Sequence, residues 1–212
     1  MITHLLFDLD NTLYSARYGL EDNVSCRISN FLVEMLGADL KEVEKIRKEL
    51  IKSYGTTLEW LIAEHGFTDV ESYFKAICPE NEAESLPADP NLGDFLDSIT
   101  LPKAILTNSP REHADRILAK LGISRHFSYI FDIRVNNLKG KPNPQAFFRS
   151  LEAMEARIET TLFIDDQPRF VEGFLALGGK GLLLDEFDQY SGFQSERIND
   201  IREIIRFLEI RS

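Results

Sequence analysis

Cysteine is scarce in this 212-residue chain, and long apolar runs are absent. The two cysteines, Cys26 and Cys78, form neither a disulfide framework nor a C-x-x-C metal motif, so we expect both to be small buried groups. No apolar run approaches the ~18 residues that a membrane-spanning helix needs. The first residues do not resemble a secretory signal, because Asp8 interrupts the only apolar stretch. We therefore expect a cytoplasmic protein with no membrane partner.

Basic residues are also in short supply. The chain has 24 Lys and Arg against 35 Asp and Glu, which gives a net charge of −11. Such a surface repels the phosphate backbone of nucleic acids, so we expect no nucleic-acid partner. An anionic small molecule would need a local positive site, formed by a bound cation or by a few lysines. The length allows one sizeable core, or a core with a modest second domain.

Short continuous apolar runs alternate with helical patterns after residue 90. Runs without polar alternation are typical of strands that are buried on both faces of a parallel sheet. Their alternation with helices predicts an α/β protein with a Rossmann-like, doubly wound parallel sheet. The predicted strands cover 2–8, 102–108, 129–133, 160–166 and 179–184.

Two of the intervening helices carry start signals. In SPREHADRILAKLG, Ser109 is expected to cap the helix, with Pro110 at its first position and Glu112 completing a capping box. In NPQAFFRSLEAM, Asn143 is expected to cap the helix that Pro144 opens. These signals place helices directly after the second and third predicted strands.

Residues 15–90 break the alternation and show one helical pattern after another. We therefore expect an all-helical insertion, here called the cap, that follows the first strand almost at once. The core is then predicted to comprise 1–14 and 91–212. Near the end of the chain, the apolar spacing from Ile198 to Leu208 predicts an amphipathic helix that packs on the sheet.

Polar residues of particular kinds follow four of the predicted strands. Ligands of open parallel sheets gather at the carboxyl ends of the strands, so we expect these residues to converge. Together they would supply several carboxylates, a hydroxyl group and a lysine. The first strand ends in Asp8 and Asp10, the second in Thr107 and Asn108, Lys141 follows the third, and the fourth ends in Asp165 and Asp166.

This combination suits phosphoryl transfer. Clustered carboxylates repel one another, and Mg²⁺ would relieve that repulsion while also binding a substrate phosphate. A carboxylate such as Asp8 can attack phosphorus, favoured by positive charge from the metal and Lys141. Asp10 has the chemistry of a proton donor to the leaving alkoxide. Candidate ligands of the phosphoryl oxygens are Thr107, Asn108 and the backbone N–H groups after Asp8, beginning with that of Leu9.

Each element alone has an ordinary explanation. An Asp-x-Asp sequence after a strand is commonly a turn or a helix cap, and Lys141 alone would be a surface lysine. Asp165 and Asp166 could equally begin a helix. The placement of all of them at successive strand ends favours a site. The four histidines, by contrast, are expected to be structural or solvated.

The segments FDLDNTLY, ILTNS, KGKPNP and LFIDDQP resemble the ordered motifs of the haloacid dehalogenase superfamily. The resemblance extends over the whole chain, including a helical cap after the first motif. Within the superfamily, the chain is most similar to the pyrimidine 5′-nucleotidase branch, through D-x-D-N-x-L-Y and F-I-D-D. The dehalogenases lack an acid at the position of Asp10, which argues against carbon–halogen chemistry.

The resemblance implies a role for each motif residue. Asp8 would be the nucleophile and a ligand of Mg²⁺. Asp10 would be the general acid and base, with its backbone carbonyl on the metal. Thr107 and Lys141 would bind and neutralise the phosphoryl group, assisted by Asn108.

The metal sphere and the substrate contacts are implied in the same way. Asp166 would complete the ligand sphere of the metal. Asp165 would lie outside the direct ligands or bind the metal through a water molecule. Tyr14, Arg17 and Tyr18 enter the cap beside the catalytic loop and could contact the substrate.

The implied activity is Mg²⁺-dependent hydrolysis of a small phosphomonoester, with UMP or CMP as the leading substrate. A sugar-phosphate phosphatase, a phosphoglycolate phosphatase or a phosphomutase would use the same motifs. A non-catalytic regulatory protein that binds phosphate is the alternative of another class. That alternative predicts erosion of the motif residues, all of which are present in this chain.

Overall fold

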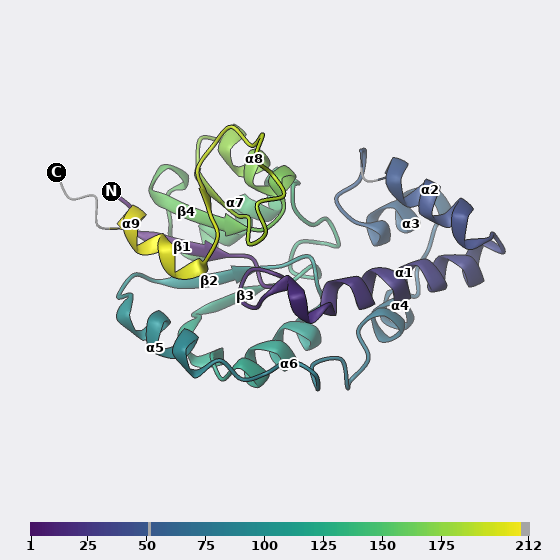
Figure 1. Ribbon diagram of the computed structural model, residues 1–212. Coiled ribbons are helices and arrows are strands. Elements are labelled where there is room, and N and C mark those ends of the chain that lie inside the picture. The colour runs from purple at the N-terminus through teal and green to yellow at the C-terminus, as the bar shows by residue number, and fades with distance from the viewer. Residues whose placement is uncertain (51, 209–212) are drawn as a thin grey trace.

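A six-stranded sheet forms the centre of the computed structural model, which describes residues 1–50 and 52–208 (Figure 1). Every neighbouring pair of strands is parallel, in the order β3-β2-β1-β4-β5-β6. All five predicted runs form strands, and the α/β class is confirmed. The strands are β1 (His4–Phe7), β2 (Lys103–Leu106), β3 (Tyr129–Phe131), β4 (Thr161–Asp165), β5 (Lys180–Leu184) and β6 (Arg197–Ile198).

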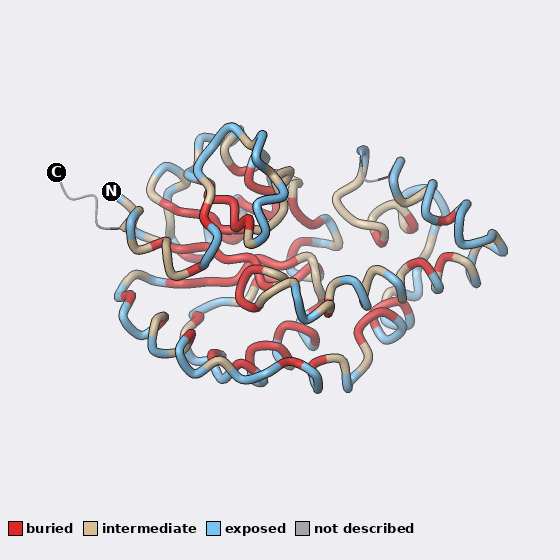
Figure 2. The backbone as a smooth tube through the Cα atoms, viewed as in Figure 1, coloured by how far each residue is buried: buried red, intermediate tan, exposed pale blue. Residues whose placement is uncertain are grey.

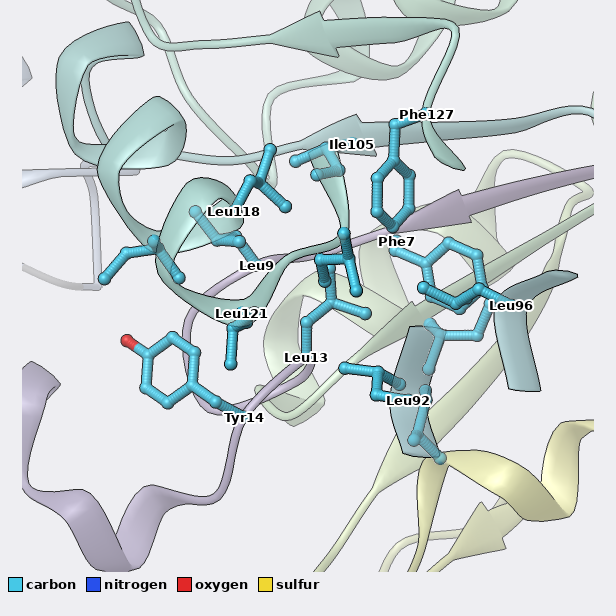
Figure 3. Packing of buried hydrophobic residues seen from close by; sticks show 14 of the residues in the cluster. Phe7, Leu9, Leu13, Tyr14, Leu92, Leu96, Ile105, Leu118, Leu121 and Phe127 are labelled. Carbon is cyan, nitrogen blue, oxygen red and sulfur yellow. The ribbon is translucent and has the colours of Figure 1, made fainter. Parts of the chain in front are cut away.

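Helices cover both faces of the sheet, which buries its central strands except for His4 at the start of β1 (Figure 2). Alternate residues of a strand point to opposite faces, so Leu5 and Phe7 join one hydrophobic cluster and Leu6 joins the other. Figure 3 shows Phe7 among residues of the first cluster. The first face is covered by α5 (Pro90–Ser98) and α6 (Arg111–Leu121), and the second by α7 (Pro144–Ala153) and α8 (Pro168–Ala176).

The helices that follow β1 lie beside the sheet, away from both termini (Figure 1). Most of their buried apolar residues form a hydrophobic cluster of their own, which Ile133 of the core joins, while Leu20 packs in the first cluster of the core. This arrangement is the all-helical insertion that the sequence predicts, while the proposed bounds 15–90 stay a prediction. The four helices are α1 (Leu20–Leu36), α2 (Leu40–Leu50), α3 (Thr57–His65) and α4 (Val70–Ile77).

The predicted capping box at the start of α6 is wrong. Pro110 occupies the cap position and makes no side-chain cap bond. The hydroxyl of Ser109 instead donates to Asp10 Oδ2 at 2.8 Å, and the carboxylate of Glu112 accepts from Arg134 at 2.7 Å. A tertiary partner thus replaces the local one at Ser109.

The other predicted start is confirmed, since the side chain of Asn143 accepts from the backbone of Gln145 at 3.0 Å and Pro144 opens α7. The predicted single helix after residue 197 is wrong, although its packing on the sheet is confirmed. Ile198, Ile201 and Ile204 are buried in the first cluster. The segment consists of β6, the 3₁₀ helix η4 (Ile201–Ile204) and α9 (Ile205–Leu208), and residues 209–212 lie outside the described part. No described helix is both long and apolar enough to cross a bilayer.

Candidate active site

A cavity of about 860 Å³ lies between the carboxyl ends of the strands and the cap helices. Volumes of this order are typical of small-molecule sites. Residues after β1, β2 and β4 line one side of it, and residues of α1 to α4 line the other. The structure thereby brings distant strand ends together. The predicted site residues that line the cavity are Asp8, Asp10, Thr107, Asn108, Lys141 and Asp166.

Lys141 is buried between two carboxylates. Its Nζ lies 2.5 Å from Asp8 Oδ1 and 2.6 Å from Asp165 Oδ2, and its side chain is only 1% exposed. Burial alone would lower the pKa of Lys141, but the charges of Asp165 and Asp8 more than offset this effect and raise it. Lys141 is therefore a fixed positive charge beside Asp8.

The side chain of Asn108 holds the backbone of Lys141 in place. Its Oδ1 accepts from Lys141 N at 2.7 Å, and its Nδ2 donates to Lys141 O at 3.1 Å. This close approach requires a glycine at position 140, because a Cβ there would lie 2.2 Å from Asn108 Oδ1. In this structure Asn108 thus acts on the loop that carries the lysine. Thr107, buried beside it, accepts from Ser109 N at 3.0 Å.

Three carboxylates cluster beside Lys141. Oxygen atoms of Asp8, Asp165 and Asp166 all lie within 4.8 Å of one another. Burial, only partly offset by Lys141, raises the pKa of Asp8 to about 7 and that of Asp165 to about 6. Burial and the charge of Asp8 raise the pKa of Asp166 well above its ordinary value. Such oxygen donors with an excess of negative charge fit a small divalent cation such as Mg²⁺.

The two aspartates at the end of β4 differ in their surroundings. Asp165 is fully buried, and its two oxygens accept from the backbone of Gln167 at 2.8 Å and from Lys141. Asp166 lines the cavity, and its Oδ2 accepts from the side chain of Gln167 at 2.7 Å. Asp166 is thus the better placed of the two to face a bound ion, while Asp165 orients the lysine.

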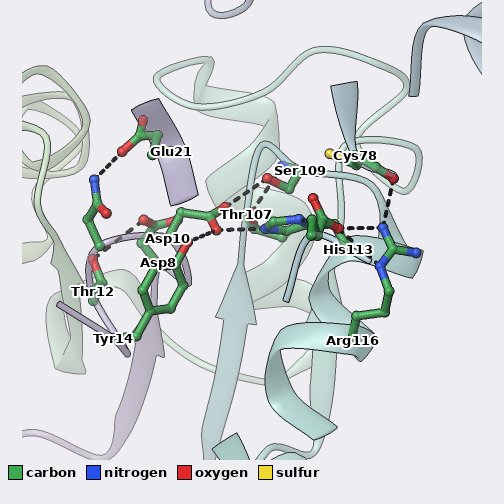
Figure 4. A network of polar contacts seen from close by, with 12 residues as sticks. Asp8, Asp10, Thr12, Tyr14, Glu21, Cys78, Thr107, Ser109, His113 and Arg116 are labelled. Carbon is green, nitrogen blue, oxygen red and sulfur yellow. Dashed lines mark hydrogen bonds and ion pairs between the residues drawn. The ribbon is translucent and has the colours of Figure 1, made fainter. Parts of the chain in front are cut away.

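Asp10 is surrounded by hydrogen-bond donors (Figure 4). Its Oδ1 accepts from the Tyr14 hydroxyl at 2.6 Å and lies 2.7 Å from His113 Nε2, and its Oδ2 accepts from Ser109 Oγ at 2.8 Å. Burial alone would raise the pKa of Asp10. The charge of His113 and hydrogen bonds from His113, Tyr14 and Ser109 outweigh burial and lower the pKa to about 2.

His113 has no role in the sequence-based prediction, yet its side chain is buried against Asp10. On the other side of the ring, Nδ1 lies 2.9 Å from Glu82 Oε1. Burial lowers the pKa of His113, but the charge of Asp10 outweighs it and raises the pKa well above 6.5. The available signal was helical spacing, because His113 precedes the buried Ile117 by one turn on α6.

Glu21 is a further carboxylate that sequence reasoning missed. It belongs to the first turn of α1, lines the cavity and accepts a hydrogen bond from Asn11. Burial, followed by the charges of Asp10 and Asp8, raises its pKa to about 7. Helical spacing alone could not distinguish it from the solvated acids of the same helix.

The residues predicted to contact the substrate lie elsewhere in this structure. Tyr14 is buried at Asp10, and Arg17 is exposed in an ion pair with Glu186 at 3.2 Å. Tyr18 lines a second cavity of about 320 Å³, of which Tyr14 is also part. Among the described residues, the cap side of the main cavity is formed by others, including Arg47, Tyr73 and Phe74.

Two curated relatives resemble this chain along much of its length. One is phosphate metabolism protein 8 of Saccharomyces cerevisiae, 28% identical over an alignment of 206 residues that covers 91% of this chain and 64% of that protein. The chain therefore spans less than two thirds of the yeast protein. The other is 6-phosphogluconate phosphatase of Escherichia coli, 25% identical over 172 residues, or 78% of this chain and 74% of that protein.

The fold is also shared with a solved structure. The crystal structure of a HAD phosphatase from Thermococcus onnurineus superposes with a TM-score of 0.67 at 18% identity, covering 98% of each chain. The family model of the haloacid dehalogenase-like hydrolases matches residues 2–178, which include the residues of the four predicted motifs. The chain belongs to the haloacid dehalogenase-like hydrolases.

Proposed function

We propose that this chain is a Mg²⁺-dependent phosphomonoester hydrolase that forms an aspartyl-phosphate on Asp8. The position of Lys141, 2.5 Å from Asp8 and 2.6 Å from Asp165, carries this proposal. A carboxylate nucleophile must approach an anionic phosphoryl group, and a buried ammonium group beside it offsets the repulsion. The names of two relatives, a phosphatase and a phosphate metabolism protein, support the same reaction class.

The reaction would proceed in two steps. A carboxylate oxygen of Asp8 bonds to phosphorus while the bond from phosphorus to the leaving oxygen breaks, and Asp10 gives that oxygen a proton. Water then attacks the same phosphorus, Asp10 takes its proton, and Asp8 leaves as a free carboxylate. The low pKa of Asp10 suits the second step. The first step needs its protonated form, which the negative charge of an incoming phosphoryl group would favour.

The metal would be held by Asp8 and Asp166, with the backbone carbonyl of Asp10 nearby and Asp165 behind them. When bound, Mg²⁺ would neutralise charge on the phosphoryl oxygens and on the carboxylate cluster. Thr107 and the N–H groups of the loop that begins at Leu9 would bind the remaining phosphoryl oxygens. Tyr14 would orient Asp10. Arg17 and Tyr18 would act on the substrate only indirectly, because they lie in the segment that leads from β1 into the cap.

For the substrate, we propose a pyrimidine nucleoside 5′-monophosphate such as UMP or CMP. The cavity volume of about 860 Å³ accommodates a nucleotide. The largely buried rings of Tyr73 and Phe74 line the cap side, where Arg47 donates to the hydroxyl of Ser29. The resemblance to the pyrimidine 5′-nucleotidase branch supports the same substrate.

A sugar phosphate is the second candidate substrate. The Escherichia coli relative named 6-phosphogluconate phosphatase favours this alternative. Such a substrate has no base that could contact Tyr73 and Phe74 on the cap side of the cavity. The two candidates therefore differ in the dependence of KM on these residues.

Phosphate release from a panel of esters tests the proposal. The purified protein should hydrolyse p-nitrophenyl phosphate with Mg²⁺ and lose this activity in excess EDTA, and Asp8→Asn should be inactive. Among natural esters, UMP and CMP should have higher kcat/KM than 6-phosphogluconate and phosphoglycolate. Turnover of sugar phosphates without UMP or CMP would reject the substrate, and activity of Asp8→Asn would reject the nucleophile. Tight phosphate binding without turnover would favour a regulatory protein.

A further inference from the structure

The side chain of His113 connects Asp10 with the chain segment that returns from the cap to the core (Figure 4). Its Nε2 lies 2.7 Å from Asp10 Oδ1, and its Nδ1 lies 2.9 Å from Glu82 Oε1. The side chains of His113 and Glu82 are only 1% and 2% exposed. Asp10 therefore holds the ring through a hydrogen bond at Nε2, whereas Glu82 forms an ion pair at Nδ1 without hydrogen-bond geometry.

Glu82 is itself held from more than one element. One turn along α6, Arg116 donates to Glu82 Oε1 through Nε at 3.0 Å and to Cys78 O through Nη2 at 2.9 Å. From α1, Arg27 Nη2 lies 3.9 Å from Glu82 Oε2. Because both helices contact the same carboxylate, the segment around 78–82 is docked against α1 and α6. The position of His113 therefore depends on that docking.

The residues that contact Asp10 come from different parts of the chain. Tyr14 and Ser109 also donate to Asp10, but both lie within the strand-end loops of the core. Among the described residues that contact Asp10, His113 is the one that also contacts residues 78–82, here called the cap-return segment. This second contact is its ion pair with Glu82. The Asp10 carboxylate, whose side chain is 17% exposed, keeps some access to the cavity.

We propose that His113 is a positioning residue that orients the Asp10 carboxylate toward the leaving oxygen, with the Glu82 carboxylate paired to the other side of the ring. This inference rests on the proposed phosphatase function. In this role His113 acts through Asp10 and not directly on the substrate or the metal. It also makes the geometry of the proton donor depend on the docked cap-return segment.

Leaving-group chemistry distinguishes this task from a purely structural one. An alkyl leaving group needs a proton as it departs, whereas p-nitrophenolate departs readily without one. The parameter kcat/KM reports only the steps up to formation of the aspartyl-phosphate. Loss of the orientation of Asp10 should therefore lower kcat/KM for an alkyl phosphate and leave that for p-nitrophenyl phosphate nearly unchanged. A general loss of structure would lower both.

The experiment compares the variants His113→Asn, Glu82→Gln and Asp10→Asn with p-nitrophenyl phosphate and glycerol 2-phosphate, both in saturating Mg²⁺. For His113→Asn we expect a loss of ~10 to 10² in kcat/KM on the glycerol ester, as a misplaced group produces. Asp10→Asn should lose ~10² to 10⁴ on that ester. Glu82→Gln should show the pattern of His113→Asn more weakly. The double variant His113→Asn with Asp10→Asn should be no slower than Asp10→Asn alone, because both act through one group.

His126 offers a matched control. Its side chain is also buried, 3% exposed, and its Nε2 lies 3.1 Å from Asp97, but it lies outside the cavity. His126→Asn should leave the ratio of the two kcat/KM values unchanged.

Two results would overturn the proposal while leaving the phosphatase function intact. One is an equal loss on both esters in His113→Asn and Glu82→Gln, and the other is additive loss in the double variant. Glu82→Gln also keeps the test open if His113→Asn does not fold, which far-UV circular dichroism would reveal. A wild-type protein that hydrolyses neither ester would overturn both the phosphatase function and the role of His113.

Discussion

The ammonium group of Lys141 combines two properties that conflict in most proteins, a full charge and nearly complete burial. Two carboxylates, Asp8 and Asp165, make this combination tolerable, and each of them depends on the lysine in turn. Removing one partner of a buried pair leaves the other charge uncompensated. Both the stability of the fold and the activity should therefore depend on Lys141.

Lys141→Met should abolish phosphate release and lower the free energy of unfolding by about 3 kcal/mol in excess EDTA. The methionine fills the space of the side chain but leaves Asp8 and Asp165 without their cation. Urea denaturation and phosphate release measure the two effects. Lys103→Met is the matched control. Lys103 is also buried, but its Nζ donates to the backbone carbonyls of Ile99 and Leu101, the latter at 3.1 Å. This variant should lose stability and keep its kcat/KM. A fully active Lys141→Met would contradict the account.

The loop between β3 and α7 leaves no room for a side chain at Gly140. The amide of Asn108 packs directly against Gly140, and its two hydrogen bonds hold the backbone of Lys141. A single added methyl group at Gly140 must therefore move either Asn108 or the lysine loop.

Gly140→Ala should lower kcat/KM and destabilise the protein by about 1–3 kcal/mol, the usual cost of overpacking. The reason is the distance of 2.2 Å between the new Cβ and Asn108 Oδ1. Thermal unfolding and steady-state kinetics provide the measurement. Gly192→Ala is the control, because nothing lies within 4 Å of a Cβ at that position. If Gly140→Ala matched the wild type in both kcat/KM and stability, the contact of Asn108 with Gly140 would not constrain the loop that carries Lys141.

The elements differ in how well the sequence predicts them. Continuous apolar runs indicate β1 to β5, because strands buried on both faces leave no polar alternation. The two-residue β6 leaves no such signal, and its pairing with β5 depends on tertiary contacts. The sequence likewise predicts a local cap at Ser109 because it does not show the tertiary partner. Its capping pattern is genuine, but Asp10, 99 residues away in sequence, is the partner in the structure.

The same limit applies to the site. Asp8, Asp10, Thr107 and Lys141 follow strands, and the topology of a parallel sheet makes their convergence predictable. His113 lies inside a helix, where a buried polar residue looks like part of an amphipathic face. Only the contacts with Asp10 and Glu82 reveal its task, and these join three segments that are far apart in sequence.

For the whole molecule, the carboxylate cluster should couple stability to pH and to metal. Asp8, with an ordinary pKa of 3.8 that is raised to about 7 in the fold, binds its proton more tightly in the folded state. Unfolding therefore releases protons between about pH 4 and pH 7, so stability falls as pH rises through this window. The pKa of about 6 for Asp165 acts in the same direction. Above pH 6.5, the raised pKa of His113 does so as well.

In excess EDTA, the free energy of unfolding should thus be lower at about pH 7.5 than at about pH 5. Mg²⁺ competes with protons for the cluster, so it should stabilise the protein more at the higher pH. Urea denaturation with EDTA or Mg²⁺ at both pH values checks this outcome. Asp166→Asn, which removes one proposed ligand, should show a reduced effect of Mg²⁺. Equal stabilisation by Mg²⁺ at both pH values would contradict a metal site formed by these carboxylates.

In the proposed reaction, Asp8 carries the phosphoryl group between the substrate and water. In Asp10→Asn, water attack loses its base, so the aspartyl-phosphate should accumulate. Acid quenching of this variant with p-nitrophenyl phosphate and Mg²⁺, followed by peptide mass spectrometry, locates the bound group. We predict one phosphoryl group on the peptide that contains Asp8, and none when Asp8→Asn is added. A phosphoryl group on any other residue, or its retention in the double variant, would contradict the account.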